Sequence, residues 1–505
     1  MYGGGSGNGQ AFMGVNKPTH QEAGAPMANW NANGQYPQAE VNYSPIEGPS
    51  VEGTPLYTDA GVNPAQAAKL SRFRLQGFKD VWAAILFIPF ALFPIVWGIL
   101  QLITYPIESV PSQSPSSDKK VIRLDFHWIF WTCLAAVGAS IISSSVILKV
   151  AQRFPIQIIY IGNIASIIFL LVSATVAFLR INIVMGFVLL VVGIFRAIWF
   201  FLARNRIPFA AALLKTSLRI INAFKFTYVL SFILGAVSCG YVILWGYGVL
   251  ALIDRFQKGT GNGGYIAAMF LLVFSVLWVS QVIPNVMHVT TCGLVATWYF
   301  AGFANMPRNP TLASFKRATT TSFGTICFGS LVVAIVEFLR FLLSQGESGN
   351  EDNFLRCLGD CLLGCLQHIL EMFNKYAFVH VAIYGCSYIE GAKRTFKLCQ
   401  QCFCAGLFNE CLVSPTLTML ALTLSILYAL IVGVFTKSWP LGVLVFVISV
   451  TVHWLFFSVV DSAVATVFVC FAEAPEALRE SDPQLYDTIY ATDTNGTNNN
   501  APPPI

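Results

Sequence analysis

The sequence predicts an all-α polytopic membrane protein: a bundle of about ten transmembrane helices preceded by a disordered N-terminal tail. Two observations predict this fold class. Only 11% of the 505 residues are charged, against about 25% in an ordinary soluble domain, so the chain cannot cover a water-exposed surface. The apolar residues also gather in long runs: segments 271–289 and 419–435 each have roughly the 18 residues of a spanning helix.

Composition divides the chain into three regions. Residues 1–68 are rich in Gly, Asn, Gln and Pro and have too few apolar residues for a core, so we expect a disordered cytosolic tail. Residues 69–475 hold the apolar runs and form the predicted transmembrane transporter domain. Residues 476–505 form a short polar tail, also expected in the cytosol. No cleavable signal peptide is visible, so the first span is expected to act as a signal anchor.

Apolar run length, cut at charges and turn residues, predicts ten spans. They are expected near 81–104, 127–150, 156–179, 182–202, 226–252, 265–288, 321–343, 369–388, 413–435 and 440–471. The eighth is the weakest because polar residues interrupt it, so nine or eleven spans are the alternatives.

Lys and Arg residues are unevenly divided between the two sides of this arrangement. Seventeen fall on the side that holds both termini, and nine, Lys375 among them, fall on the other. Cytosolic loops carry the excess of Lys and Arg, so both termini are predicted to be cytosolic. The sequons at Asn42 and Asn495 then lie in cytosolic tails and should be unmodified. The small net charge of +5 is spread over helix ends, which argues against a nucleic-acid partner.

Two cysteine clusters fall in the second half of the chain. Apolar packing or lipid-facing thiols is the favoured interpretation, because Cys behaves as a small hydrophobe in apolar surroundings. A zinc site and S-acylation are the alternatives, and no metal is predicted. The clusters are Cys357, Cys361 and Cys365, and Cys399, Cys402 and Cys404.

Polar and amphipathic side chains share one face of the sixth span. Trp278, Gln281, Asn285 and His288 lie at i, i+3, i+7 and i+10, within a stripe of about 80°. Pro284 lies beside them and removes a backbone hydrogen bond. Polar groups within a span normally face the bundle interior or a water-filled path, so we predict a cavity lining. Hydrogen bonding that only holds the helices together is the alternative.

Two later spans add to this pattern. In the tenth, Asp461 shares a face with Trp454 and Ser458. A carboxylate about two-thirds of the way along an apolar helix predicts a counter-charge or an exchangeable proton, with a structural ion pair or cap as the alternative. In the seventh, Glu337 and Arg340 are expected to form a snorkelling i,i+3 pair.

Aromatic faces beside a buried carboxylate suit a quaternary ammonium ligand, which is held by ring quadrupoles and a counter-charge. The predicted substrate-binding residues are Trp278, Gln281, Asn285, His288, Trp298, Tyr376, His380, Tyr384, Trp454 and Asp461.

Four segments of the second half resemble the choline transporter-like family. They are ARNRIPFAAALLKTSLRIIN (203–222), similar to the loop after that family's fourth span, WVSQVIPNVMHVTTCGLVATWYF (278–300), NKYAFVHVAIYGCSYIEGAKRTFKL (374–398) and VDSAVATVFVCFAEAP (460–475), which includes Asp461. The resemblance implies ten spans, cytosolic termini, the plasma membrane, and facilitated or proton-coupled movement of choline and related amines. The short connection at 105–126 and the Gly/Asn-rich tail resemble the fungal branch, the pH-nine-sensitive type.

We therefore predict a secondary or facilitative carrier whose partners are a small cationic solute and the lipid bilayer. A non-transporting membrane protein with a structural, lipid-binding or pH-response role is the alternative. An enzyme is disfavoured because the sequence lacks H-E-x-x-H, G-x-S-x-G and G-x-x-x-x-G-K-[ST]. No cofactor is expected, and the oligomeric state stays open.

Overall fold

The computed structural model describes residues 77–104, 126–180, 183–258, 263–344, 353–483 and 485–487. Within these ranges the chain folds into helices and short connections, with no strand. The expected tail at 1–68, both sequons and most of the polar tail at 476–505 lie outside the described residues.

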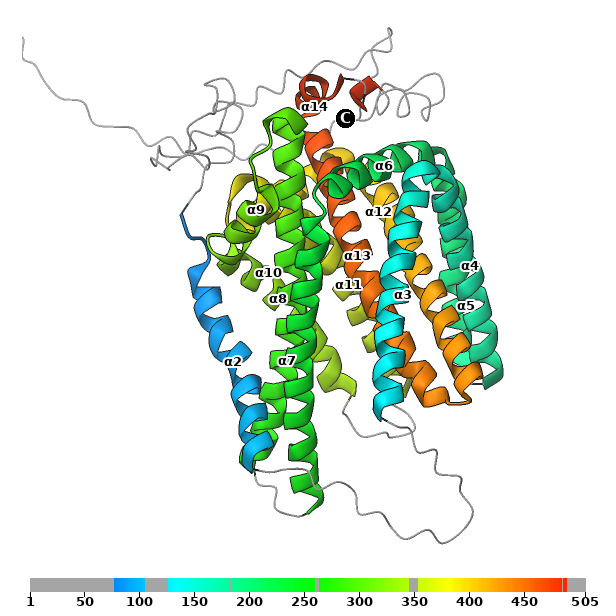
Figure 1. The fold of residues 1–505 in the computed structure, drawn as a ribbon, viewed down its shortest axis with the longest axis vertical. Coiled ribbons are helices and arrows are strands. Elements are labelled where there is room, and N and C mark those ends of the chain that lie inside the picture. The colour runs from blue at the N-terminus through cyan, green and yellow to red at the C-terminus, as the bar shows by residue number, and fades with distance from the viewer. Residues whose placement is uncertain are drawn as a thin grey trace, which may run out of the picture.

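In the described part of the chain, ten long helices form the bundle (Figure 1). They are α2 (Val81–Thr104), α3 (Phe126–Arg153), α4 (Pro155–Arg180), α5 (Ile183–Ala203), α7 (Phe226–Gln257), α8 (Gly263–Ala301), α10 (Phe323–Ser344), α11 (Asn353–Tyr384), α12 (Tyr388–Thr436) and α13 (Trp439–Glu473). The shorter elements are η2 (Arg204–Arg206), α6 (Ile207–Ala223), η3 (Phe303–Asn305), α9 (Pro310–Thr319) and α14 (Pro475–Ser481). The polytopic helical architecture predicted from the apolar runs is confirmed.

Nine segments of the described chain are long and apolar enough to cross a membrane. Helix α11, which contains the expected eighth span, is not among them, although it packs against α8, α10 and α12. The reason lies in its sequence, because α11 carries charged and amide side chains such as Gln367, Glu371 and Lys375 among its apolar residues. Nine apolar spans, together with α11 as a long helix of higher polarity, therefore account for the ten that run length predicts.

Helix α6 lies across one end of the bundle (Figure 1). It forms most of the segment 203–222, which follows the fourth long helix as the family resemblance implies, and this connection is helical. The helix is amphipathic and buries its apolar face, including Ile207, Leu213 and Leu218, against the long helices. Helix α6 therefore covers this end of the core with its apolar face.

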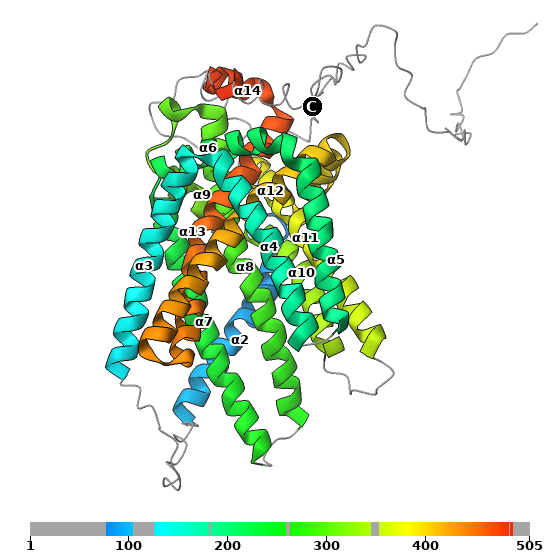
Figure 2. The same ribbon diagram turned by 90° about the vertical axis from the view of Figure 1, so that its right-hand side faces the viewer.

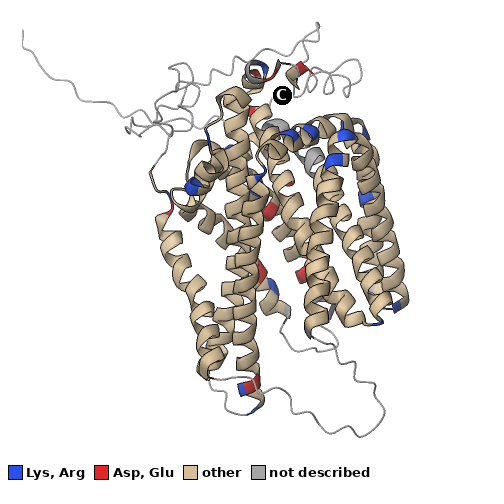
Figure 3. Cartoon of the chain, viewed as in Figure 1, with Lys and Arg blue, Asp and Glu red and all other residues tan. Residues whose placement is uncertain are grey.

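Both ends of the described chain lie on the same side of the bundle. Helix α14 and α6 lie together at the end opposite to the last residues of α7 (Figure 2). The start of α2 is on that side too (Figure 1). Most of the Lys and Arg residues lie there as well, on α6 and around α9 (Figure 3). The arrangement has the charge asymmetry that the sequence predicts between its two ends.

Asp80, just before α2, ties three helix starts together. Its Oδ2 accepts hydrogen bonds from the backbone N–H of Tyr388 at 2.8 Å and from Thr325 Oγ1 at 3.0 Å. Tyr388 begins α12 and Thr325 lies in the first turn of α10. An anionic oxygen at a helix N-terminus satisfies free N–H groups and complements the helix dipole.

The cysteine clusters lie on α11 and α12. Cys361 and Cys365 are exposed, and the side chains of Cys357, Cys402 and Cys404 lie outside the described part. Among the described side chains, no group of His, Cys, Asp and Glu is suited to hold a metal ion.

Candidate functional site

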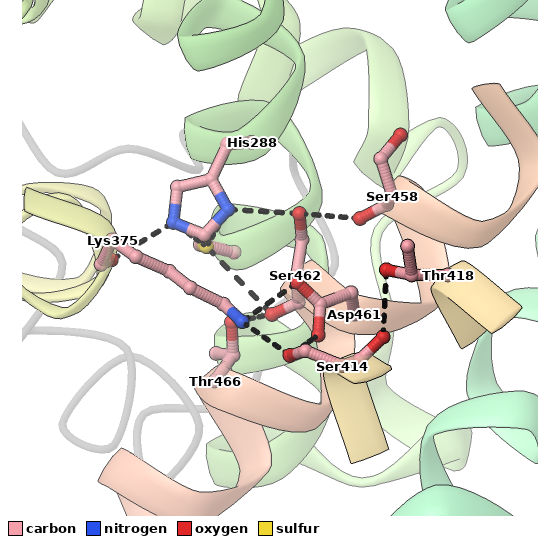
Figure 4. Close-up of polar contacts among 9 residues, drawn as sticks. His288, Lys375, Ser414, Thr418, Ser458, Asp461, Ser462 and Thr466 are labelled. Carbon is pink, nitrogen blue, oxygen red and sulfur yellow. Dashed lines mark hydrogen bonds and ion pairs between the residues drawn. The ribbon is translucent and has the colours of Figure 1, made fainter. Parts of the chain in front are cut away.

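The carboxylate of Asp461 is the centre of a polar cluster inside the bundle (Figure 4). Its Oδ2 lies 2.6 Å from Nζ of Lys375, and its Oδ1 accepts a hydrogen bond of 2.6 Å from Ser414 Oγ. Nζ of Lys375 also lies 3.4 Å from Ser414 Oγ. Lys375 comes from α11, Ser414 from α12 and Asp461 from α13, so three helices meet at one ion pair. We call these three residues and His288 the central cluster.

His288 of α8 fixes the surroundings of this pair. Its Nε2 lies 2.9 Å from the backbone carbonyl of Lys375, and its Nδ1 lies 2.8 Å from Ser462 Oγ, next to Asp461 (Figure 4). A carbonyl only accepts, so Nε2 carries the proton that it donates to Lys375. The sulfur of Cys292, one turn along α8, lies 3.5 Å from the same ring nitrogen. The imidazole thus joins α8 to α11 and to α13 on either side of the ion pair.

Both charged side chains of the pair are largely shielded from solvent. The exposed fraction is 14% for the Lys375 side chain and 26% for that of Asp461. A buried ion that loses its partner leaves an uncompensated charge, which costs about 3–5 kcal/mol. Removal of either charge is therefore expected to destabilise the bundle.

Lys375, Ser414 and Glu473 belong to the polar clusters of the structure, and the sequence alone does not single them out. The count of basic residues places Lys375 outside the membrane, on the side away from the termini, whereas the structure brings its Nζ to Asp461 inside the bundle. That placement is wrong because it does not consider a partner on another helix. The sequence does contain a signal for the pair: Lys375 lies within the expected span 369–388 and Asp461 lies within the tenth. Ions inside a membrane bundle normally pair, so the two residues could have been matched.

A second polar cluster lies at the end of α13. Oε1 of Glu473 lies 3.0 Å from His380 Nε2, and its Oε2 accepts a hydrogen bond of 2.7 Å from the Tyr384 hydroxyl. The rings of His380 and Tyr384 are nearly parallel, at an interplanar angle of 20°. The guanidinium of Arg394 lies over the Tyr384 ring, 4.5 Å from its centroid. This terminal cluster contains the two ingredients of cation recognition, an aromatic face and a carboxylate.

The other members of the α8 stripe contact α10. The Trp278 side chain is fully buried, packs against Phe87 and donates from Nε1 to the Cys327 carbonyl at 3.1 Å. Gln281 donates to Glu337 Oε1 at 2.8 Å, and Asn285 donates to Ser330 Oγ at 2.9 Å. The stripe therefore makes interhelical hydrogen bonds along its whole length, and His288 is its member in the central cluster.

Glu337 and Arg340 do not form the expected i,i+3 pair. Glu337 accepts from Gln281 and from Gln367 of α11, at 2.8 and 2.9 Å. Arg340 donates from Nε to Asp360 at 2.9 Å and from Nη1 to Gln367 at 2.7 Å. Both side chains turn toward α11 because it offers partners across the interface, so the snorkelling interpretation is corrected.

Three predicted site residues, which are described next, make none of the polar contacts that define the two clusters. Trp298 is buried near the end of α8, its ring against Phe303. Tyr376 is buried with its ring against Phe468. Trp454 is 53% exposed on α13, so its ring faces away from the protein core. The binding roles of all ten residues stay predictions, with Asp461 and His288 together in the central cluster and His380 and Tyr384 together in the terminal cluster.

Comparison with known proteins covers the range that holds both clusters. The sequence model of a family described as plasma-membrane choline transporter matches residues 187–476. The chain is 36% identical over 318 residues to a CTL-like protein of Dictyostelium discoideum, a match that spans 61% of this chain and 56% of that protein. It is 28% identical over 441 residues to Protein PNS1 of Gibberella zeae, with 82% of each chain covered. Protein PNS1 of Cryptococcus neoformans is 28% identical over 501 residues, with 91% and 89% covered.

Proposed function

Because the chain belongs to the plasma-membrane choline transporter family, we propose that it carries a small organic cation of the choline class across the plasma membrane. The observation that supports this proposal best is the half-buried carboxylate of Asp461, held between α11, α12 and α13. A carboxylate inside a membrane bundle is costly unless it serves a cation, a proton or an ion pair.

The chemistry of both clusters favours a cation over an anion or a neutral solute. Each is organised around a carboxylate of α13, Asp461 in one and Glu473 in the other. Both carboxylates already contact nitrogen groups of the chain, Lys375 Nζ and His380 Nε2. A nitrogen group therefore fits at both positions, and at Asp461 that group is a cation.

The two acidic residues are twelve positions apart on α13, which corresponds to about 18 Å of helix rise. Both face α11, through Lys375 and through His380 and Tyr384. This spacing supports a route for the cation along the α11–α13 interface, from the central cluster to the end that carries α14. Movement driven by the cation gradient alone and movement coupled to protons are both compatible with this route.

Uptake by reconstituted vesicles tests the proposal. Purified protein in liposomes is expected to take up radiolabelled choline faster than protein-free liposomes, and excess tetramethylammonium should reduce the rate. A pH gradient of either sign shows whether protons are coupled. Folded protein that neither takes up choline nor is stabilised by it would contradict the proposal and favour the non-transporting role.

A further inference from the structure

We infer that Lys375 is a tethered competitor of the transported cation: its ammonium and the cationic group of the solute occupy the carboxylate of Asp461 in turn. The inference deepens the proposed function and rests on it. It assigns to Lys375 a role in deciding which cations the central cluster accepts and how tightly it holds them.

The contacts divide the carboxylate into a fixed half and an exchangeable half. Ser414 Oγ donates to Oδ1 at 2.6 Å, and this short side chain has no flexible stem on which to withdraw. Lys375 Nζ contacts Oδ2 at 2.6 Å and Ser414 Oγ at 3.4 Å. The ammonium is a compact charge on a flexible four-carbon stem. It can therefore withdraw from Oδ2 while Ser414 still holds Oδ1.

Charge explains why occupancy must alternate. Two cations against one buried carboxylate leave a net positive charge in the bundle, and a carboxylate without a cation leaves a negative one. With both groups ionised, one ion pair at a time keeps the central cluster neutral. A solute cation that arrives at Asp461 must therefore displace the ammonium, and the ammonium must return when the solute leaves.

Because His288 holds the backbone of α11 at Lys375, the Lys375 side chain can move while the helix stays in place. Its Nε2 donates to the backbone carbonyl of Lys375 at 2.9 Å, which anchors α11 at this residue. Its Nδ1 contacts Ser462 at 2.8 Å and anchors α13 beside Asp461. The imidazole thus bridges the α11 backbone and the Ser462 side chain of α13, and the side chain of Lys375 is left as the mobile part. His288 acts here as a positioning residue.

Ligand-induced thermal stabilisation of the purified full-length chain in detergent tests the inference. Tetramethylammonium is the probe because it has the charge of a quaternary ammonium solute and no N–H group to donate. Lys375→Gln removes the competitor, and Lys375→Arg keeps a tethered cation as the matched control. The double variant Lys375→Gln/Asp461→Asn removes both charges and reports stabilisation that does not depend on the carboxylate.

We expect the concentration of tetramethylammonium that gives half-maximal stabilisation to fall roughly tenfold or more in Lys375→Gln, because a tethered competitor acts at a high effective concentration. Lys375→Arg should stay close to wild type, and the double variant should show no stabilisation. An unchanged concentration in Lys375→Gln, or equal stabilisation of the double variant, would overturn the inference.

A second measurement uses the wild-type chain and so does not depend on the folding of any variant. Acetylation of Lys375 by a small succinimidyl ester, followed by mass spectrometry, should increase when tetramethylammonium displaces the ammonium. Lys375 labelling that does not change would contradict the competition. If vesicles that contain the wild-type protein take up no choline, the proposed function is contradicted instead. The failure of the inference and the failure of the proposed function are therefore distinguishable.

Discussion

Glu473, the last residue of α13, lies with its Oε1 3.0 Å from Nε2 of His380 in the last turns of α11. Its other oxygen accepts from the Tyr384 hydroxyl at 2.7 Å. The chain leaves α11 immediately afterwards, at Gly385, whose φ of 63° is in the left-handed region that glycine tolerates best. The terminal cluster therefore holds α11 in place at the point where the backbone turns into α12.

Glu473→Gln is expected to lower the melting temperature of the protein in detergent. The amide replaces a charged acceptor of two hydrogen bonds, and hydrogen bonds to charged groups contribute about 1.5–3 kcal/mol each. Glu476→Gln is the matched control, because Glu476 is exposed and its contact with Arg479 is 3.7 Å long. A melting temperature that falls equally in both variants, or in neither, would show that Glu473 does not join the two helices.

Asp461→Asn is expected to abolish choline uptake. The change keeps the size of the side chain but removes the counter-charge, and it leaves the Lys375 ammonium without its partner, at a cost of about 3–5 kcal/mol. Thermal stability should therefore fall too. Asp360→Asn is the control, since Asp360 is exposed and pairs with Arg340 at the other end of α11.

The double variant Lys375→Met/Asp461→Asn separates the two effects of this change. It removes both charges, so the melting temperature should recover toward wild type while uptake stays lost. Uptake by Asp461→Asn at the wild-type rate would leave the ion pair a structural element and remove the support for the proposed function.

Trp278→Phe is expected to destabilise the protein by about 1–3 kcal/mol, because it leaves the Cys327 carbonyl without its buried donor. The same change at Trp454 is the control. Its ring is 53% exposed, and exposed substitutions usually change stability by less than about 0.5 kcal/mol. Melting curves of both variants in one detergent measure the difference. Similar losses at the two positions would contradict the packing of the α8 stripe against α10.

The comparison of these two tryptophans shows what helical periodicity can predict. Trp454 and Asp461 lie seven residues apart, so they share one face of α13 by spacing, yet the structure exposes the first and half-buries the second. Crossing helices separate along their length, so one face contacts protein at one level and lipid at another. Periodicity gives the face of a helix but not the depth at which a neighbour covers it.

The apolar runs and Asp461 were accessible from the sequence because each is a property of one segment. Lys375, Ser414 and Glu473 were not selected, because their importance comes from partners on other helices: Lys375 is 86 residues from Asp461, and Glu473 is 93 residues from His380. Pairing between helices depends on the tertiary packing of the bundle. The polar residues that make the eighth span the weakest prediction belong to α11, a helix that contributes residues to both clusters.

Asp80→Ala is expected to destabilise the protein by about 1–2 kcal/mol. It removes the acceptor at the start of α12 and the bond to Thr325, and loss of a capping side chain typically costs about this much. It also places alanine at a φ of 50°, in the left-handed region, which asparagine and aspartate adopt more readily. Asp80→Asn should therefore lose less stability than Asp80→Ala in the same melting experiment. The reverse order would show that neither the cap nor the backbone conformation is important.

The orientation in the membrane is the most direct prediction from the charge distribution. Lys and Arg gather at the end that holds α6, α9 and α14 (Figure 3), and the positive-inside rule places that end in the cytosol. An epitope tag at either terminus should then be detected only after the cells are permeabilised. A tag at Ser116, between α2 and α3, should be detected on intact cells.

The insertion at Ser116 also supplies its own control, because the permeabilised sample must label all three tags if the proteins are expressed equally. Labelling of both termini on intact cells would reverse the orientation, and the α14 end would then face the outside. Labelling of only one terminus would mean that the chain crosses the membrane an odd number of times. In that case the less apolar α11 would be the helix that does not span.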